Sequence, residues 1–296
     1  MSLFGRPTYG YGPRSNPMKW IIAAIIAGIG IITYLRSGQV NPVTGEKQYV
    51  AMNVDQEKTL GLEAAPRMAA ELGGAADPAR DPDARLVSEV GMKVMRTIDP
   101  AKNAYRDNFH YFLLNDAKTV NAFALPGGQV FITRALYDRL ENEAQLGGVL
   151  GHETGHVIAR HSAQQMAKGK LGQMLAGAAG VATSDRGQGG AMAAQMVNQM
   201  MQLKYSRTDE LQADNFGLIY MSQAGYDPRH MLRVMEILKQ ASGGGGRGPD
   251  IFATHPDPDA RIAAIKEWLA ANESKLPRNV GTGRPLHGSS DRFTPR

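Results

Sequence analysis

The sequence predicts an α+β protein that is mostly helical, with a short β-sheet and one apolar helix ahead of the folded domain. Three observations lead to this fold class. Residues 20–35 form a continuous apolar run without a charge. Residues 109–133 contain three short strand-like segments, of which the last two are separated by Pro126-Gly127-Gly128. Apolar residues at helical spacing surround the segment 152–156, which is therefore expected on a central helix.

The elements are expected in a simple order along the 296 residues. The chain divides into a disordered basic tail (1–18), a membrane anchor (19–36), a linker (37–54), the folded domain (55–274) and a second disordered basic tail (275–296). The expected helices cover 55–72 with a kink at Pro66, 84–98, 141–166, a stretch ending at Gly225, one starting at Pro228, and 258–272. The expected strands cover 109–114, 119–125 and 129–133, and 41–45 is expected to be a turn.

The apolar run has the properties of a membrane-spanning helix. Its sixteen residues reach about 24 Å as a helix, slightly short of a hydrocarbon core of about 30 Å. Trp20 and Tyr34 lie near its two ends, where interfacial aromatic residues are favoured. The run is long for a cleaved signal peptide and lacks a convincing small-residue cleavage site, so an uncleaved anchor is the favoured interpretation and a soluble, processed protein the alternative.

Positive charge ahead of the span favours a cytoplasmic N-terminus, although Arg36 behind it weakens this inference. In a bacterial host the protein would then be a single-pass protein of the inner membrane, with its folded domain in the periplasm.

Composition excludes some classes of function. Residues 1–19 contribute +3 and residues 275–296 contribute +4, so residues 20–274 carry −2 within the total of +5. A nearly neutral domain does not indicate a nucleic-acid partner, and basic residues beside a membrane segment are explained by topology and anionic lipid. The chain has no cysteine, which excludes disulfides and thiolate metal sites.

Residues 167–203 are rich in glycine, alanine, methionine and glutamine. The favoured interpretation is a helical hairpin with an adaptable methionine core. The alternative is a mobile flap over a substrate cleft or against the membrane, with residues 184–190 as its tip.

The segment His152-Glu153-Thr154-Gly155-His156 carries the chemistry. Histidines four residues apart share one helical face and can bind one metal ion, and a carboxylate beside that ion can take a proton from water that the ion acidifies. Four glycines, Gly147, Gly148, Gly151 and Gly155, lower the helix propensity, so this helix is expected to be buried with neighbouring backbone close to it.

A zinc site needs a third protein ligand. The long metzincin pattern would put glycine and histidine three and six residues beyond His156, where this chain has Ala159 and Ser162. His161 is turned off the metal-binding face of a continuous helix and is expected to be structural or exposed. Glu210 and Asp214 share a helical face, so one could bind zinc and the other orient a histidine, but spacing alone favours an ordinary acidic face.

A family resemblance covers roughly residues 55–272. The chain resembles the membrane-associated zinc metallopeptidases of the HtpX and BepA type, peptidase family 48 of the metallopeptidases, which also includes the CaaX prenyl endopeptidases. The four blocks that carry it are NAFALPGGQVFI (121–132), LGHETGH (150–156), SRTDELQAD (206–214) and THPDPDARI (254–262). The resemblance implies a gluzincin fold. Unlike the multi-spanning members, this chain has one candidate membrane segment.

The resemblance also implies roles for particular residues. It implies one zinc ion per chain, held by His152, His156 and Glu210, with Glu153 as the general base and Asp214 holding a ligand in place. It places His255 and Arg261 near the zinc. They are expected to stabilise the oxyanion, or His255 to take the fourth zinc position and silence the resting enzyme. A substrate segment is expected to bind extended beside residues 119–125, where Asn121 would hold its backbone.

The function that follows is a membrane-anchored zinc metalloendopeptidase. Its substrates would be unfolded or misassembled envelope proteins, which makes protein quality control the expected role. The alternative is a chaperone-like binding protein of the envelope that cleaves rarely. A CaaX-type processing role is disfavoured because those enzymes enclose their site within many membrane helices.

Overall fold

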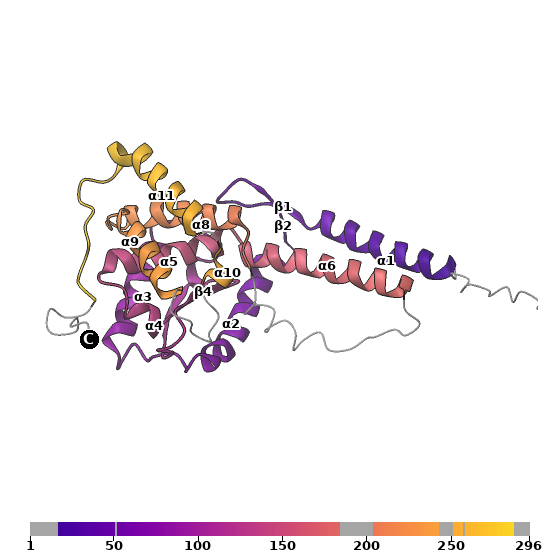
Figure 1. The fold of residues 1–296 in the computed structure, drawn as a ribbon, viewed down its shortest axis with the longest axis horizontal. Coiled ribbons are helices and arrows are strands. Elements are labelled where there is room, and N and C mark those ends of the chain that lie inside the picture. Colours follow the sequence, from indigo (N-terminus) through magenta and orange to yellow (C-terminus); the bar gives the residue numbers. More distant parts are fainter. Residues whose placement is uncertain (1–16, 51, 184–203, 243–250, 257, 287–296) are drawn as a thin grey trace, which may run out of the picture.

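The computed structural model describes residues 17–50, 52–183, 204–242, 251–256 and 258–286. It is a mostly helical body with a small sheet, from which two helices project as an arm (Figure 1). The helices are α1 (Pro17–Arg36), α2 (Val54–Glu71), α3 (Pro82–Met95), α4 (Arg134–Tyr137), α5 (Glu143–Ile158), α6 (His161–Thr183), α8 (Arg207–Gln223), α9 (His230–Ser242), α10 (Ile251–Thr254) and α11 (Pro258–Asn272), with short 3₁₀ turns η1 (Arg106–Asn108) and η2 (Glu273–Lys275). The predicted α+β class, mostly helical with one apolar helix first, is confirmed.

The main sheet has three strands in the order β3 (His110–Leu114), β5 (Gln129–Thr133), β4 (Ala122–Leu125). β5 pairs parallel with β3 and antiparallel with β4, and all of its residues are buried. The predicted turn joins β4 to β5, with Gly127 at φ 85° and Gly128 at φ 109°, a region that glycine adopts without strain. β4 is an edge strand of this sheet, so one side of it is available for pairing.

The glycines of α5 allow a neighbouring backbone to lie close to the helix, as its sequence predicts. Every residue of α5 is buried. A Cβ on Gly151 would lie 3.2 Å from Gly217 Cα of α8, and a Cβ on Gly155 would lie 3.0 Å from Ala213 O. The missing side chains therefore let α8 approach α5 backbone to backbone, which brings the acidic residues of α8 to the histidines of α5.

The prediction of one helix over 141–166 is wrong, because α5 ends at Ile158 and α6 begins at His161. Arg160 lies between them in the left-handed region at φ 59°, an unusual conformation for a residue with a side chain. The Arg160 guanidinium is fixed there by an ion pair with the buried Glu57 and by a hydrogen bond to Met52 O. These contacts compensate the strain and turn the chain into a new direction.

α6 and α1 lie side by side and form the arm (Figure 1). Residues 167–183 continue α6 as one helix along α1, and the second helix of the expected hairpin would fall outside the described residues, so the hairpin stays a prediction. Residues 184–203, including the expected tip at 184–190, lie outside the described residues. Within the described part of the chain, α1 is the one helix long and apolar enough to cross a membrane.

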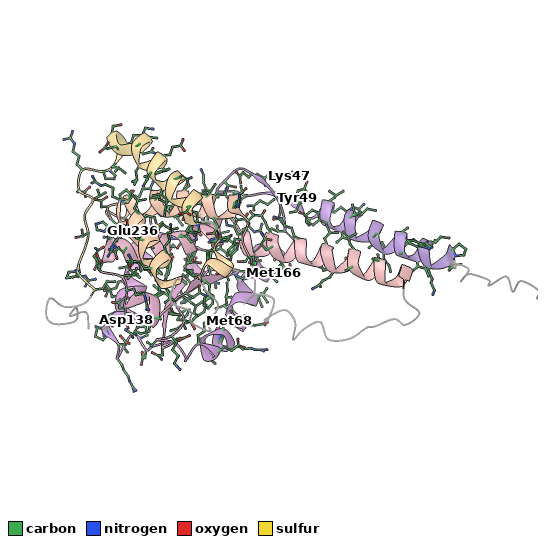
Figure 2. The ribbon with its side chains drawn as sticks, viewed as in Figure 1. Lys47, Tyr49, Met68, Asp138, Met166 and Glu236 are labelled. Carbon is green, nitrogen blue, oxygen red and sulfur yellow. The ribbon has the colours of Figure 1, made fainter. Side chains whose placement is uncertain are left out.

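The expected linker 37–54 contains a hairpin of β1 (Gly38–Val40) and β2 (Lys47–Tyr49) at the root of the arm, where Figure 2 also shows Met166. The predicted turn is present, since Asn41 Oδ1 accepts the backbone N–H of Val43 and of Thr44. Asn41 Nδ2 donates to Ile158 O and Gln48 Nε2 to Ala159 O, which satisfies carbonyls at the C-terminal end of α5.

The expected disorder of 275–296 is wrong for its first part, because the described residues 276–286 run along the body (Figure 1). The backbone forms bridges between Pro285 and Asn142 and between Gly281 and Tyr226. Arg284 forms ion pairs with Glu143 at the start of α5 and with Glu89. Basic and glycine-rich composition suggested disorder, but these partners on the body fix the segment. Residues 287–296 lie outside the described part.

Removing this segment is expected to destabilise the domain. Ending the chain after Lys275 removes the carbonyls of Thr282 and Arg284 that accept the N–H groups of Ala144 and Glu143 at the N-terminus of α5. We expect Tm to fall by about 5 °C or more, as for a loss of a few kcal/mol in a domain of this size. A chain that ends after Leu286 is the matched control and should melt like the full chain in a calorimeter. Equal Tm values for both truncations would contradict the prediction.

Candidate metal centre

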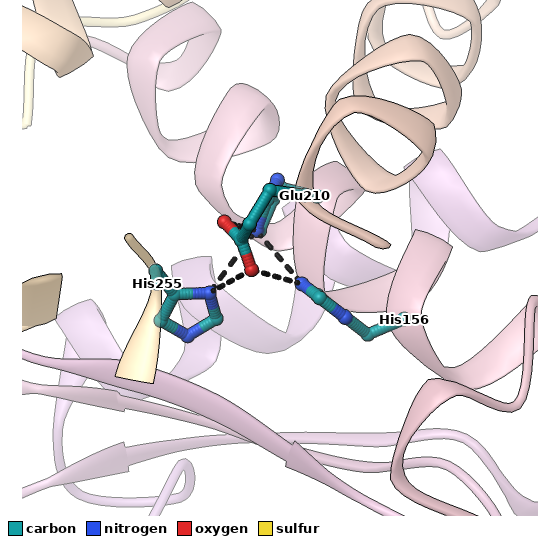
Figure 3. Close-up of side chains that lie close together, drawn as sticks. His156, Glu210 and His255 are labelled. Atoms are coloured by element: carbon teal, nitrogen blue, oxygen red, sulfur yellow. Dashed lines mark hydrogen bonds and ion pairs between the residues drawn. The ribbon is translucent and has the colours of Figure 1, made fainter. Parts of the chain in front are cut away.

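Four buried side chains from three segments meet in the middle of the body (Figure 3). His152 and His156 come from successive turns of α5, Glu210 from the first turn of α8, and His255 follows α10 directly. One potential ligand atom from each lies within 4.8 Å of every other, a spacing that allows them to hold one metal ion. The structure thus brings together the three predicted zinc ligands and one further histidine.

The separations are those of groups that face a common point. His152 Nε2 lies 3.0 Å from His156 Nε2. Glu210 directs Oε1 to 3.4 Å from His156 Nε2 and Oε2 to 3.6 Å from His152 Nε2. His255 Nδ1 lies 3.1 Å from Glu210 Oε1. Burial alone would raise the pKa of Glu210, but the charge and the hydrogen bond of His255 outweigh it and lower that pKa, so this carboxylate is ionised.

Asp214 fixes the orientation of His152. Its Oδ1 lies 2.8 Å from His152 Nδ1 and accepts the ring hydrogen, which leaves Nε2 facing the cluster. Arg261 holds Asp214 in turn through two hydrogen bonds of 2.7 Å. Burial tends to raise the pKa of Asp214, but Arg261 and His152 lower it overall. Asp214 therefore lies where the sequence places it, behind a predicted ligand.

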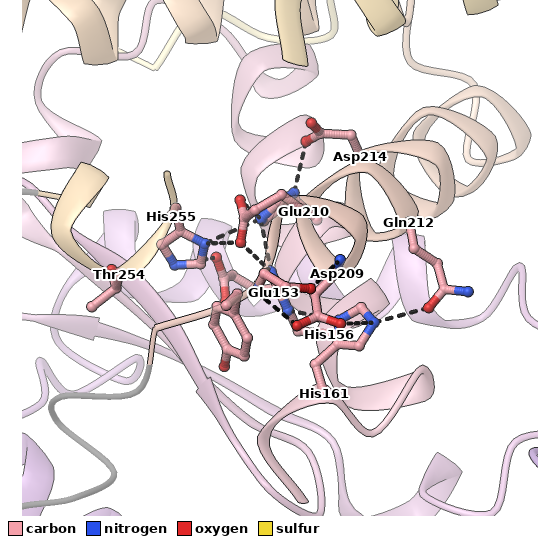
Figure 4. A network of polar contacts seen from close by, with 12 residues as sticks. Glu153, His156, His161, Asp209, Glu210, Gln212, Asp214, Thr254 and His255 are labelled. Carbon is pink, nitrogen blue, oxygen red and sulfur yellow. Dashed lines mark hydrogen bonds and ion pairs between the residues drawn. The ribbon is translucent and has the colours of Figure 1, made fainter. Parts of the chain in front are cut away.

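His156 is oriented by a chain of hydrogen bonds that the sequence does not reveal (Figure 4). Gln212 Nε2 donates to Glu46 Oε2 at 2.7 Å, so Gln212 Oε1 must accept the hydrogen of His161 Nε2 at 2.9 Å. Burial lowers the pKa of His161 and keeps it neutral, so its Nδ1 is an acceptor. That atom lies 2.9 Å from His156 Nδ1 and accepts its hydrogen. The lone pair of His156 is therefore on Nε2, facing His152.

Of the two alternatives expected for His161, the exposed one is wrong and the structural one is confirmed. It is buried, and it sets the tautomer of a predicted ligand. The turn at Arg160 explains the error, because the helical face expected for His161 assumed an unbroken helix.

These tautomers test whether the residues fit a metal ion. Burial also keeps the pKa of His156 well below its usual value. With a hydrogen bond at each Nδ1, the two Nε2 atoms face each other 3.0 Å apart, beside an ionised carboxylate. When both atoms carry lone pairs, they repel each other unless a cation lies between them. Two imidazole nitrogens and one carboxylate are a donor set that suits zinc. The residues present fit the metal ion.

Glu153 lies beside this cluster and is not part of it. It is buried, and among the described residues its Oε2 has no hydrogen-bond partner. Burial raises its pKa above the usual range, against the opposing charges of His255 and His152. A carboxylate with a raised pKa and a free oxygen is suited to accept a proton and pass it on.

His255 closes the centre. The cavity beside the cluster has a volume of about 20 Å³ and is lined by His152, Glu153 and His255 among others. This volume has room for about one water molecule and none for a peptide. His255 Nε2 has no hydrogen-bond partner in the described structure and lies 3.8 Å from Glu153 Oε1. The pKa of His255 is raised, since Glu210 and Glu153 outweigh the effect of burial.

The two remaining predicted residues lie differently. The guanidinium of Arg261 is held by carboxylates, since Nη1 lies 2.8 Å from Glu210 Oε2 and the other nitrogens bind Asp214. Asn121 is buried just before β4, and its Oδ1 has no partner among the described residues. Its neighbour Ala122, and not Asn121, lines the cavity.

Tyr205 is a residue of the site that was not predicted. Its ring centroid lies 3.9 Å from that of His156, and its hydroxyl lies 2.9 Å from Ser162 Oγ. Tyr205 directly precedes the block that begins at Ser206, and this position was the only signal in the sequence. The ring covers one face of a predicted ligand and restricts how far that imidazole can tilt.

The hydrogen bonds that link Gln212, His161 and His156 are expected to contribute to metal affinity. We expect Gln212→Leu to lower metal affinity by about 10- to 100-fold, because His161 loses the acceptor that fixes its tautomer. Competition with a chromophoric chelator measures this. Gln223→Leu is the matched control, since Gln223 is exposed at the end of the same helix. Equal metal affinities of the two variants would show that these hydrogen bonds do not set the tautomer of His156.

Comparisons with known proteins agree with this geometry. The profile of Peptidase family M48 matches residues 84–269, which include all four buried residues of the cluster. The mitochondrial metalloendopeptidase OMA1 of Schizosaccharomyces pombe is 30% identical over 89% of this chain and 75% of its own length. The beta-barrel assembly-enhancing protease of Escherichia coli is 28% identical over 84% of this chain. This chain spans about half the length of that relative, 51%.

Proposed function

The chain belongs to peptidase family M48 and is a metallopeptidase, and we propose that it is a zinc metalloendopeptidase that acts at a membrane on unfolded proteins of the cell envelope. The observation that carries the proposal is the pair of His Nε2 atoms, which face each other beside Glu210. One apolar helix that is long enough to cross a membrane supports anchoring to a membrane. The inner membrane and a periplasmic domain remain part of the proposal.

In the proposed site His152, His156 and Glu210 hold the zinc ion. Bound there, zinc would supply a Lewis acid and an acidified water. Glu153 would accept a proton from the attacking water and deliver a proton to the leaving amine, two roles that its raised pKa suits. Asp214 and His161 keep the two imidazoles in the tautomer that binds metal. Arg261 binds both Asp214 and Glu210 through its guanidinium and so fixes the positions of these two carboxylates.

We propose that His255 is inhibitory in the closed arrangement. Its Nδ1 lies among the three proposed ligands, and the cavity behind it cannot admit a peptide. Substrate entry therefore requires α10 and His255 to move outward. The opposite role, stabilisation of the oxyanion by His255, predicts the opposite effect of removing the imidazole.

The substrate is proposed to bind as an extended strand along β4. β4 is at the edge of the sheet, packs against α5, and its Ala122 lines the cavity beside Glu153. The Oδ1 of Asn121 is buried and has no hydrogen-bond partner among the described residues, so it would accept a substrate N–H group once the site opens. Pairing through main-chain groups accepts many sequences but requires an extended chain, which favours unfolded polypeptides.

A chaperone-like protein that cleaves rarely is the second candidate, and the closed centre favours it. Experiments on the full chain in detergent distinguish the protease from the chaperone-like protein. Elemental analysis should find one zinc ion per chain, and reduced, unfolded casein should be cleaved faster than a folded protein of similar size. Chelation should abolish cleavage and added zinc restore it. Zinc without cleavage, together with suppressed aggregation of unfolded protein, would favour the chaperone. The lack of stoichiometric zinc would refute both the ligand set and the enzyme.

A further inference from the structure

We propose that the outer half of α6, residues 171–183, lies in the lipid bilayer beside α1, so that two helices of this chain enter the membrane. The proposal rests on α1 being the membrane anchor of the proposed function. It adds a second contact with lipid, in a helix that starts at the metal centre.

The register between the two helices is set by one close contact. α1 runs toward the body and α6 runs away from it, so they are antiparallel (Figure 1). A Cβ added to Gly30 of α1 would lie 3.3 Å from Met174 Cβ of α6. The absence of a side chain at Gly30 lets α6 approach closely at this level, as small residues do between membrane helices. Residues at equal distances from Gly30 and Met174 therefore lie at the same depth.

This register puts the charges of both helices at one level. Arg36 is six residues from Gly30 toward the body, and Lys168 is six residues from Met174 in the same direction, each about 9 Å along its helix. Lys168 and Lys170 are both exposed. Basic side chains at one level, next to Tyr34, are typical of the boundary between hydrocarbon and water.

Beyond that level neither helix carries a charge for most of its length. Residues 171–183 contain no charged residue, and their outer end is nine residues from Met174, about 14 Å, which reaches the level of Ile21. A water-exposed location for α6 would leave the apolar run of α1 in water beside it, because the two helices lie side by side (Figure 1). If α1 is in lipid, the outer half of α6 is at the same depth.

The side chains agree with this location. Ala23 and Gly30 are buried on the face of α1 that meets α6, and Ala178 is buried on α6. Apolar side chains are exposed on both helices, with Leu175 at 38% and Ile25 at 55% exposure, and Gln173 is the one exposed polar side chain among the described side chains of residues 171–179. Such a surface is favourable against lipid and unfavourable in water. Alone, thirteen uncharged residues are too short to span a bilayer, and such lengths are typical of re-entrant segments.

The lack of cysteine in the natural sequence makes the test direct. Three full-length single variants, Leu175→Cys, Ile25→Cys and Leu62→Cys, are reconstituted in nanodiscs, where both membrane faces are open to reagent. Leu62 is the control on the body, at 48% exposure. We expect Leu175→Cys and Ile25→Cys to react with a charged maleimide at least about tenfold more slowly than Leu62→Cys. All three should react equally in SDS. Cleavage of casein by each variant shows that it has folded.

A second measurement separates lipid contact from protein packing. A bimane probe on the Leu175→Cys variant should be quenched by lipids with a spin label in the acyl chain, and the same probe on Leu62→Cys should not. Fast labelling at 175 with slow labelling at 25 would overturn the insertion of α6 and leave the anchor intact. Fast labelling at both positions would instead refute the membrane anchor of the proposed function. Slow labelling at 175 without lipid quenching would also overturn the proposal.

Discussion

Replacing Glu153 by glutamine is expected to lower the rate of peptide cleavage by at least about 10³-fold, with one zinc ion still bound per chain. Glutamine keeps the size of the side chain but cannot take a proton. Glu153 is separate from the group that can hold the metal, so its loss should not release the ion. The measurement pairs elemental analysis with kcat/KM for a quenched fluorescent peptide.

The control for this experiment is Glu143→Gln. Glu143 is also a buried glutamate of α5, but it binds Arg284 at the far end of the helix. We expect this variant to be less stable and to keep its kcat/KM. Full activity in Glu153→Gln would remove the proposed general base. A loss of zinc in that variant would show instead that Glu153 supports the metal.

Replacing His255 by alanine is expected to raise kcat/KM for peptide cleavage by about tenfold or more, which corresponds to a resting state in which about one molecule in ten or fewer is open. The physical reason is that His255 Nδ1 lies 3.1 Å from Glu210 Oε1, inside the proposed metal site, where a substrate or water has to enter. Removing the imidazole opens this position and leaves all three proposed ligands in place. Initial rates at equal zinc occupancy measure the effect.

The matched control is His230→Ala, since His230 lies at the start of α9, and a ring nitrogen of His230 lies near Asn142 rather than the metal group. Its rate should equal that of the natural protein. A fall in the rate of His255→Ala at unchanged zinc content would contradict inhibition and support the oxyanion role. Loss of zinc in this variant would make His255 an essential ligand.

The sequence is sufficient for the parts of the site that lie on single helices. Spacing puts His152 and His156 on one face, and the glycines of α5 predict the close contact with a neighbouring backbone that the structure shows. The choice between Glu210 and Asp214 needed the family resemblance, because both lie on one helical face. The structure places them at different positions, Glu210 among the histidines and Asp214 behind His152.

Contacts between distant segments could not be predicted. The chain from Glu46 through Gln212 and His161 to His156 joins three elements, and no local pattern indicates it. His161 was misplaced because periodicity assumes a continuous helix, and one residue in the left-handed region rotates everything after it. The order of residues 276–286 depends on carboxylates of α3 and α5, which composition cannot indicate.

Because only two residues separate α5 from α6, the distance between the metal centre and the proposed membrane surface is fixed by α6. The histidine that starts α6 touches a proposed zinc ligand, and Lys168, at the proposed surface of the membrane, follows it by seven residues, about 10 Å of helix. With α6 fixed in lipid, the scissile bond has to be presented at that distance above the bilayer, which three or four extended residues can span. If both proposals hold, the distance from the lipid surface would limit where an unfolded polypeptide that leaves the membrane can be cut.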